Sequence, residues 1–155
     1  MKLFTTGLIL LLVSGAFSQN APNRIKAFNA GKDGLAIEGY DPVAYFMQTK
    51  ALKGNKENSI AYDGLLYYFS SPENKEIFKK SPAKYEPQYG GWCAFAMGNS
   101  GEKVAVDPET FKIKDGKLYL FYNKYFTNTL KSWNKDEDNL KTRADQNWKK
   151  VYPHA

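Results

Sequence analysis

The stretch IAYDGLLYYF, residues 60–69, predicts a β-hairpin. At its centre, Asp63-Gly64 is a dipeptide favoured in two-residue turns, because these turns need a positive φ at both central positions. The run that follows, residues 65–69, is apolar and rich in aromatic side chains, which is typical of a buried strand. The hairpin therefore supplies one strand to the core and makes antiparallel pairing the expected arrangement.

A second hairpin is predicted around Asp115-Gly116, between residues 111–113 and 118–122. Helices are expected to begin at Asp41-Pro42, Ser71-Pro72 and Ser81-Pro82, where a capping side chain precedes a proline suited to the first helical position. The other expected strands and loops are a strand at 35–37, a polar loop at 53–58, a loop at 87–91, a strand at 104–106 and a turn at Asp107-Pro108. The first three expected helices cover residues 43–48, residues 73–80 and a turn that leads toward Tyr85. Asn123 is expected to cap a fourth helix with Phe126, Leu130 and Trp133 on one face, and a fifth covers 136–151 with Leu140, Ala144, Trp148 and Val151 on one face. Residues 92–97 are expected to form either a short helix or a strand, which stops at Gly98. Together they predict a small single α+β domain of short antiparallel hairpins with flanking helices.

The first eighteen residues have the pattern of a secretory signal. Lys2 provides the positive start, an apolar run follows, and Ala16-Phe17-Ser18 places small residues before a cleavage point at Gln19. This run is shorter than the roughly 20 residues of an ordinary membrane span, so we expect no stable span after cleavage. The predicted organisation is a signal peptide at 1–18, a tether at 19–33 and a folded domain at 34–151, exported to a periplasmic or extracellular compartment.

Composition excludes several classes of function. Of 155 residues, 22 are Lys or Arg and 16 are Asp or Glu, a net charge of +6 without a dense basic block, so nucleic-acid binding is not expected. A single cysteine, Cys93, excludes a disulfide within the chain and a cluster of thiolates around a metal. The single histidine, His154, stands one residue from the C-terminus, so a Ser-His-Asp triad, an HExxH zinc site and a three-histidine zinc site are not expected.

Several motifs together resemble those of the secreted YHS-domain proteins, a family with selenoprotein members. The motifs are GYDPVAYF at 39–46, YYFSS at 67–71, Asn74, Phe78, PAKY at 82–85, PQYGG at 87–91, Cys93-Ala94, Asp107-Pro108 and DGKLYL at 115–120. The resemblance implies a small α+β module that binds a metal ion, related to cysteine-rich domains that handle heavy metals.

The chain departs from that family at the residues that matter for a metal. The Tyr-His-Ser triplet that names the family is Tyr68-Phe69-Ser70 here, so phenylalanine replaces histidine. Cysteines of the metal-handling relatives are expected near Ala44, Ser70 and Asn74, and this chain has none of them. Cys93 remains, at the position where some relatives are expected to carry selenocysteine, and the resemblance therefore implies redox or soft-metal chemistry there.

Cys93 is the principal candidate residue, and it has two interpretations. In the first turn of a helix after Gly90-Gly91, the backbone amides would favour a reactive, partly accessible thiolate. Met97 follows four residues later on the same helical face, so the pair offers two soft ligands that suit Cu(I). The alternative is a buried, inert cysteine beside a methionine that fills the core.

Aromatic side chains around these motifs are candidates for contact with a cofactor or ligand: Tyr40, Tyr68, Tyr89 and Trp92. The alternative for each is packing in the core. Asp41 and Asp107 precede prolines and are interpreted as helix or turn caps rather than as a pair of functional carboxylates.

Three functions follow from these residues. We expect an exported binding domain that holds a soft metal ion, copper in particular, or a small ligand near Cys93. One alternative is a redox enzyme with Cys93 as its nucleophile, which would need an external reductant because the chain has no second thiol to resolve a disulfide. The other is a domain without catalytic activity that binds a protein partner. A binding role is preferred over an enzymatic one.

Overall fold

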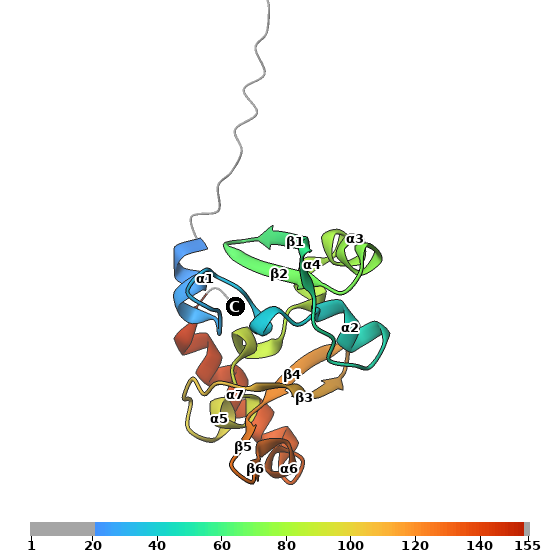
Figure 1. The fold of residues 1–155 in the computed structure, drawn as a ribbon. Coiled ribbons are helices and arrows are strands. Elements are labelled where there is room, and N and C mark those ends of the chain that lie inside the picture. The colour runs from blue at the N-terminus through green and yellow to red at the C-terminus, as the bar shows by residue number, and fades with distance from the viewer. Residues whose placement is uncertain (1–20, 154–155) are drawn as a thin grey trace, which may run out of the picture.

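Two antiparallel hairpins organise the structure, a computed structural model that describes residues 21–153 (Figure 1). The first hairpin joins β1 (Asn55–Tyr62) to β2 (Leu65–Phe69), and the second joins β3 (Asp107–Lys114) to β4 (Lys117–Phe121). The two turn residues of each hairpin have positive φ, as the Asp-Gly dipeptides predict. With the helices around them, the hairpins form the small α+β fold expected from the sequence.

Short helices flank the hairpins, and most of them begin where the sequence places a cap. The helices are α1 (Ala21–Ala27), α2 (Pro42–Met47), α3 (Pro72–Lys80), α4 (Pro82–Tyr85), α5 (Ala94–Asn99), α6 (Thr129–Trp133) and α7 (Glu137–Val151). Two 3-10 turns, η1 (Ile37–Gly39) and η2 (Gln88–Gly91), and a small hairpin of β5 (Asn123–Lys124) and β6 (Thr127–Asn128) complete the described chain. The side chains of Asp41 and Ser71 cap α2 and α3, which confirms both predicted starts.

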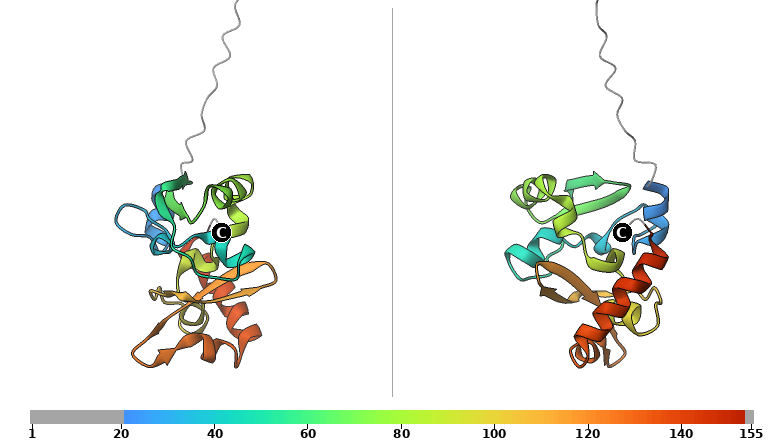
Figure 2. Two further views of the ribbon diagram at one scale, coloured as in Figure 1. Left: turned by 45° about the vertical axis from the view of Figure 1, so that its right-hand side comes forward. Right: turned by 180° about the vertical axis from the view of Figure 1, so that it is seen from behind.

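The core consists of two clusters that meet at β4, whose residues Leu118 and Leu120 belong to the first cluster and Tyr119 and Phe121 to the second. Along β2, Leu65, Tyr67 and Phe69 are buried and the residues between them are half-buried, as expected of a strand with one face in the core. These side chains belong to the first cluster. The second cluster lies between β4, α5 and α7 and includes Trp133 and Trp148. Figure 2 shows α7 running behind the second hairpin from the end that carries α6 toward α1.

The structure corrects the expectation of a tether at residues 19–33. The described part of that segment begins with α1, in which Arg24 and Ala27 are buried against the rest of the domain. The folded unit therefore includes α1. The expected signal peptide, residues 1–18, and His154 lie outside the described residues. Among residues 21–153, no helix is long and apolar enough to cross a membrane.

Four local predictions in and around the hairpins are wrong. The predicted polar loop at 53–58 is mostly strand, because β1 begins at Asn55 and accommodates an irregular register before Ser59. The segments 35–37 and 104–106 form no strand; the first contributes isolated bridges and leads into η1, and the second is irregular. Asp107-Pro108 opens β3 rather than a turn, although the Asp107 side chain accepts hydrogen bonds from Glu109 and Thr110 inside an irregular stretch of that strand.

The predicted helix after Asn123 is also wrong in its first half. Residues 123–128 form the β5–β6 hairpin, and the helix begins only after Asn128, whose side chain accepts a hydrogen bond from the backbone of Leu130. Phe126 lies at the tip of the hairpin in solvent, whereas Trp133 is buried in the second cluster. The spacing of Phe126, Leu130 and Trp133 that suggested one helical face therefore arises by coincidence.

Glu137 joins the start of α7 to the second hairpin. Its carboxylate accepts hydrogen bonds from Lys112 and Lys114 at 2.8 and 2.7 Å and from the indole N–H of Trp133 at 2.8 Å. Burial alone would raise the pKa of Glu137, but these three donors outweigh burial and lower the pKa to about 2.

Folding stability should consequently depend on pH through Glu137. Because its pKa is lower in the folded protein than the ordinary value of about 4.3, the stabilisation is complete above pH 5 and is lost as the pH falls toward 2. Urea unfolding should show Glu137→Gln less stable than the native chain at pH 7 by about 1–3 kcal/mol, with a difference that shrinks as the pH falls. A difference that stays constant between pH 7 and pH 2.5 would contradict this assignment.

Candidate functional site

Cys93 lies at the N-terminal end of α5, as predicted, but in a closed environment. It is the residue before the helix, and its backbone N–H donates to the carbonyl oxygen of Val104 at 2.9 Å. The side chain is 0% exposed. Its sulfur lies 3.4 Å from the backbone nitrogen of Tyr122, which donates to it, and 3.4 Å from the hydroxyl oxygen of Thr129. The prediction of a partly accessible thiol is therefore wrong.

The fold encloses both Cys93 and Met97, the two residues expected to hold a soft metal ion. Both side chains are fully buried, but Cys93 packs in the first core cluster and Met97 in the second. The sulfur of Cys93 already has two polar neighbours within the fold. Among residues 21–153, no group of three or more His, Cys, Asp or Glu side chains could hold a metal ion.

Alkylation measures how far Cys93 is open to reagents. Because the sulfur has no exposed surface, iodoacetamide should modify the native protein at pH 8 at least a hundredfold more slowly than it modifies the urea-unfolded chain. Intact mass as a function of time gives both rates. Native modification within tenfold of the unfolded rate would show that the thiol reaches solvent and would restore the redox interpretation.

A buried carboxylate occupies the region where the resemblance places metal ligands. Asp41 is 0% exposed. One of its oxygens accepts hydrogen bonds from the backbone amides of Val43 and Ala44 at 2.8 and 3.2 Å. The other accepts from the amide and hydroxyl of Ser70 at 2.8 and 2.6 Å and from the side-chain amide of Asn74 at 2.7 Å. Ala44, Ser70 and Asn74 are the three positions at which cysteines were expected in metal-handling relatives.

These contacts give Asp41 a structural role. Two carboxylate oxygens offer about four lone-pair directions, and five donors already point at them. The carboxylate thus joins the start of α2 to the residue after β2 and to α3, and it has no capacity left for a metal ion. The sequence interpretation of Asp41 as a cap is confirmed, and the structure adds the contacts with Ser70 and Asn74.

A second buried polar cluster ties α1 to the first hairpin. The guanidinium group of Arg24 pairs with Asp63 at 2.6 Å and with Glu86, and the hydroxyl of Tyr67 also donates to Glu86. Burial alone would lower the pKa of Arg24, but the two carboxylates outweigh burial and raise it. Arg24 is therefore a permanently charged anchor for the Glu86 carboxylate.

A cavity of about 330 Å³ opens beside η2 and the C-terminal half of α7. Its residues come from four separate parts of the chain: Phe28, Glu86, Pro87, Gln88, Tyr89, Gly90, Lys117, Asp145, Trp148 and Lys149. Gly90 has a φ of +60°, and a Cβ atom there would lie 2.6 Å from the ring of Trp148 and 3.0 Å from that of Phe28. Glycine at this position lets the two aromatic rings pack closely against the backbone of η2.

Only one of the four aromatic candidates lines this cavity. The hydroxyl of Tyr89 donates to Asp145 at 2.9 Å, and burial together with this carboxylate raises the pKa of Tyr89, so the hydroxyl stays protonated. Trp92 is half-buried and donates its indole N–H to Ala27. Tyr40 donates to Glu109 at the surface, and Tyr68 is half-buried on the outer face of β2. The four side chains therefore do not share one site.

Some of the charged side chains around the cavity already have partners within the fold, and others do not. Glu86 accepts from Arg24 and Tyr67, and Asp145 accepts from Tyr89 and lies 3.6 Å from Lys141. Lys117 and Lys149 are exposed, and within residues 21–153 neither belongs to an ion pair or a side-chain hydrogen bond. The two lysines are thus the charges that remain available to a molecule in the cavity.

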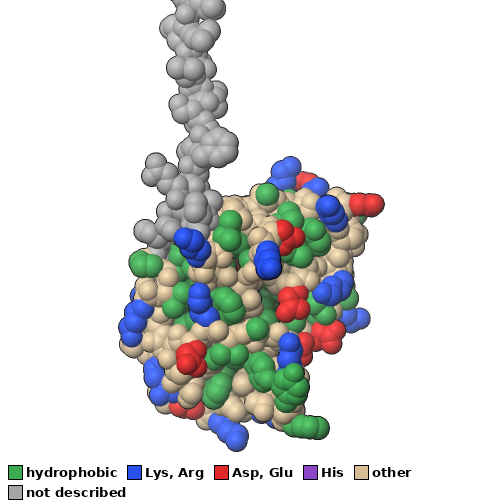
Figure 3. Space-filling view, turned by 60° about the vertical axis from the view of Figure 1, so that its left-hand side comes forward, with side chains coloured by type: hydrophobic (Ala, Val, Ile, Leu, Met, Phe, Trp, Pro, Cys, Tyr) green, Lys and Arg blue, Asp and Glu red, His purple; other side chains and the backbone are tan. Residues whose placement is uncertain are grey.

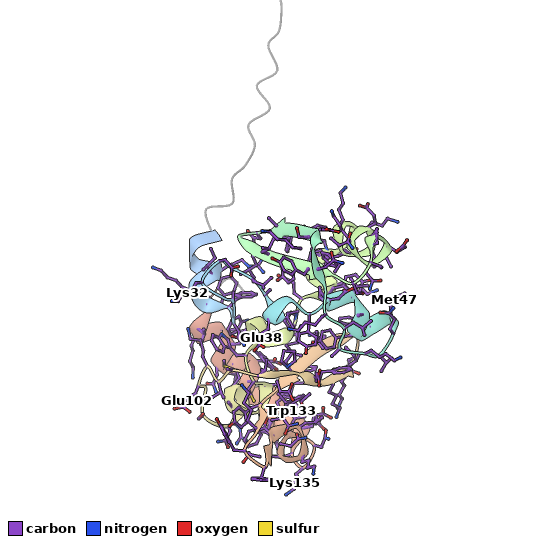
Figure 4. All side chains as sticks on the ribbon, in the orientation of Figure 1. Lys32, Glu38, Met47, Glu102, Trp133 and Lys135 are labelled. Carbon is purple, nitrogen blue, oxygen red and sulfur yellow. The ribbon has the colours of Figure 1, made fainter. Side chains whose placement is uncertain are left out.

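The sequence indicates Tyr89 as a candidate ligand contact but gives no sign of most of the cavity around it. Trp148 was predicted to lie on the apolar face of the last helix, which gives its burial but not its neighbours. Glu86 and Lys149 belong to no motif, and Lys117 lies in the DGKLYL motif as part of a hairpin, so only tertiary packing brings the three together. Figure 4 shows the described side chains filling the space between the helices and hairpins of the domain.

Comparison with known proteins identifies one part of the chain. The model of the YHS domain family matches residues 43–89, which extend from α2 to the middle of η2 and include both Ser70 and Asn74. Searches of curated proteins and of solved structures found no match. The chain therefore contains a YHS domain at residues 43–89.

Proposed function

We propose that this protein is a small-ligand binding domain whose ligand occupies the cavity between η2 and α7. The cavity volume of about 330 Å³ carries the proposal, because it lies within the range of sites for small molecules. A YHS domain is compatible with a binding module, and the cavity contains Tyr89, one of the residues expected to contact a ligand. Cys93 does not line it.

The lining residues favour a small organic anion with an apolar ring. Phe28, Tyr89 and Trp148 offer aromatic surface for a flat apolar group. Internal donors satisfy both carboxylates of the cavity, whereas Lys117 and Lys149 have no acidic partner within the described chain. A carboxylate on the ligand would compensate these two charges.

Calorimetric titration with two probes of similar shape and opposite charge tests the proposal. We expect 3-phenylpropionate to bind and phenethylamine not to bind. In the variant Lys117→Gln/Lys149→Gln, binding of 3-phenylpropionate should weaken about three- to tenfold, the size typical of exposed charge pairs. The control is Lys150→Gln, which removes a charge from the next position of α7 that does not line the cavity.

Three results would overturn the proposal. They are equal binding of the two probes, binding that the double lysine variant leaves unchanged, and the absence of binding by either probe at millimolar concentration.

Binding of a soft metal ion, copper in particular, stays a prediction from the resemblance. Anaerobic titration with Cu(I), followed by native mass measurement, gives its stoichiometry. Binding of one copper ion per chain, with no binding in Cys93→Ser, would support a metal site at that thiol. The fold would then have to open for the ion to reach the buried sulfur. Retention of 3-phenylpropionate binding by Cys93→Ser would at the same time separate the cavity from the thiol.

We also infer export from the signal-peptide pattern of residues 1–18. Intact mass of protein recovered outside the cytoplasm should correspond to a chain that begins at Gln19. Material that is secreted with residues 1–18 still attached, or retained in the cytoplasm, would contradict the inference.

A further inference from the structure

The β5–β6 hairpin ends in two aromatic side chains that the fold does not cover. Tyr125 is 87% and Phe126 111% exposed, the most exposed of the large apolar residues among those described. They are the two turn residues between Lys124 and Thr127. Neither belongs to a core cluster. Their surfaces are therefore available to something outside the chain.

The backbone of this turn makes the two aromatic residues unexpected. Their φ angles are 50° and 65°, in the left-handed region that two-residue hairpin turns require. Asparagine followed by glycine suits such a turn best, and bulky side chains are disfavoured there. Both other hairpins of the domain use Asp-Gly at the equivalent positions. Tyr125 and Phe126 thus stand at positions that folding alone would give to smaller residues.

The surroundings of the tip are basic. Lys124, Lys131 and Lys135 are exposed, and none of them forms an ion pair within the described residues. Of the three acids that follow Lys135, Glu137 and Asp138 pair with Lys112 and Lys114, so among these acids only Asp136 is left to balance the three unpaired lysines. Figure 4 places Lys135 at the end of the molecule that carries β5, β6 and α6. Figure 3 shows hydrophobic side chains projecting at the same end.

We propose that this hairpin tip docks the protein on an anionic lipid surface. Aromatic side chains are favoured at the boundary between lipid headgroups and hydrocarbon, and nearby lysines are attracted to anionic headgroups. The absence of an acidic partner for the three lysines favours a negatively charged surface over a neutral one. The cavity lies toward the other end of α7, a helix of 15 residues and about 22 Å at 1.5 Å per residue, and so stays open to solvent when the tip is docked.

Vesicle co-sedimentation tests the docking. The native chain should bind mixed phosphatidylcholine–phosphatidylglycerol vesicles and not pure phosphatidylcholine vesicles, with binding that weakens as salt is added. In Tyr125→Asn/Phe126→Gly, binding should fall about tenfold or more, because the variant removes the aromatic anchors. Since Asn-Gly suits the turn, its thermal midpoint should equal or exceed that of the native chain. Any contribution of residues 1–18 is common to both chains.

Lysine variants distinguish attraction of the vesicle by the lysines near the hairpin tip from attraction by the net positive charge of the whole molecule. Lys131→Gln/Lys135→Gln should weaken binding to the mixed vesicles, whereas Lys79→Gln/Lys80→Gln on α3 should leave it nearly unchanged. Equal binding by the native chain and the Asn-Gly variant would overturn the proposal, as would failure of the native chain to bind the mixed vesicles. Light scattering that shows a dimer in the native chain and a monomer in the Asn-Gly variant would assign the tip to self-association instead.

Discussion

Asp41→Ala is expected to reduce the stability of the domain more than any other single change of a polar side chain. The substitution leaves the amides of Val43, Ala44 and Ser70 and the side chain of Asn74 without their shared acceptor in a buried site. An unsatisfied buried donor costs about 1–3 kcal/mol. Since several donors lose the same partner, we expect a loss of about 4 kcal/mol or more in the free energy of unfolding, measured by urea denaturation at pH 7.

Asp107→Ala is the matched control, because it removes a carboxylate that also precedes a proline. Asp107 is half-buried, and among the described residues its side chain accepts only from Glu109 and Thr110. We expect a loss of about 1 kcal/mol, the usual value for one cap. If the two variants lose the same stability, the contacts of Asp41 with Ser70 and Asn74 contribute little and Asp41 is an ordinary helix cap.

Gly98→Ala should have an effect of similar size for a steric reason. Gly98 lies in α5, where a Cβ atom would sit 2.4 Å from the backbone oxygen of Leu140 in α7. Backbone atoms cannot move aside as the end of a flexible side chain does, so the two helices would have to separate. Overpacking in a core usually costs about 1–3 kcal/mol. We expect the upper end of that range or beyond, seen as a lower urea midpoint and as weaker amide protection in both helices.

Gly116→Ala provides the comparison for this variant. Gly116 has a φ of +69°, and no atom lies within 4 Å of a Cβ built there. Alanine at this turn meets only the backbone cost of the left-handed conformation, about 1–2 kcal/mol. A Gly98→Ala variant no less stable than Gly116→Ala would mean that α5 and α7 are not packed as closely as the structure has them.

Local chemistry explains the parts of the fold that the sequence predicts correctly. The Asp63-Gly64 and Asp115-Gly116 turns, and the caps at Asp41 and Ser71, depend on a few neighbouring residues. The failed helix at 123–128 shows the limit of periodicity. Its pattern of Phe126, Leu130 and Trp133 fits one helical face, but the chain turns left-handed at Tyr125 and Phe126.

The candidate site was harder to predict because long-range packing builds it. The Asp41 cap is visible in the sequence, but its contacts with Ser70 and Asn74 cross 29 and 33 residues. The cavity unites residues from Phe28 to Lys149. Cys93 stands within the apolar run of residues 92–97, and that pattern fits both a reactive thiol at a helix end and an inert thiol buried in the core. The burial of its sulfur follows from the contacts with Tyr122 and Thr129, which no local pattern records.

The indole N–H signals of the tryptophans, in a ¹H–¹⁵N correlation spectrum, test ligand binding in the cavity most directly. Trp148 lines the cavity, whereas the indole groups of Trp92 and Trp133 donate to Ala27 and Glu137 elsewhere. The three signals can be assigned with Trp→Phe variants. On titration with 3-phenylpropionate, the Trp148 signal should shift and saturate while those of Trp92 and Trp133 stay in place. Equal movement of all three signals, or saturable movement of the Trp92 or Trp133 signal alone, would contradict binding between η2 and α7.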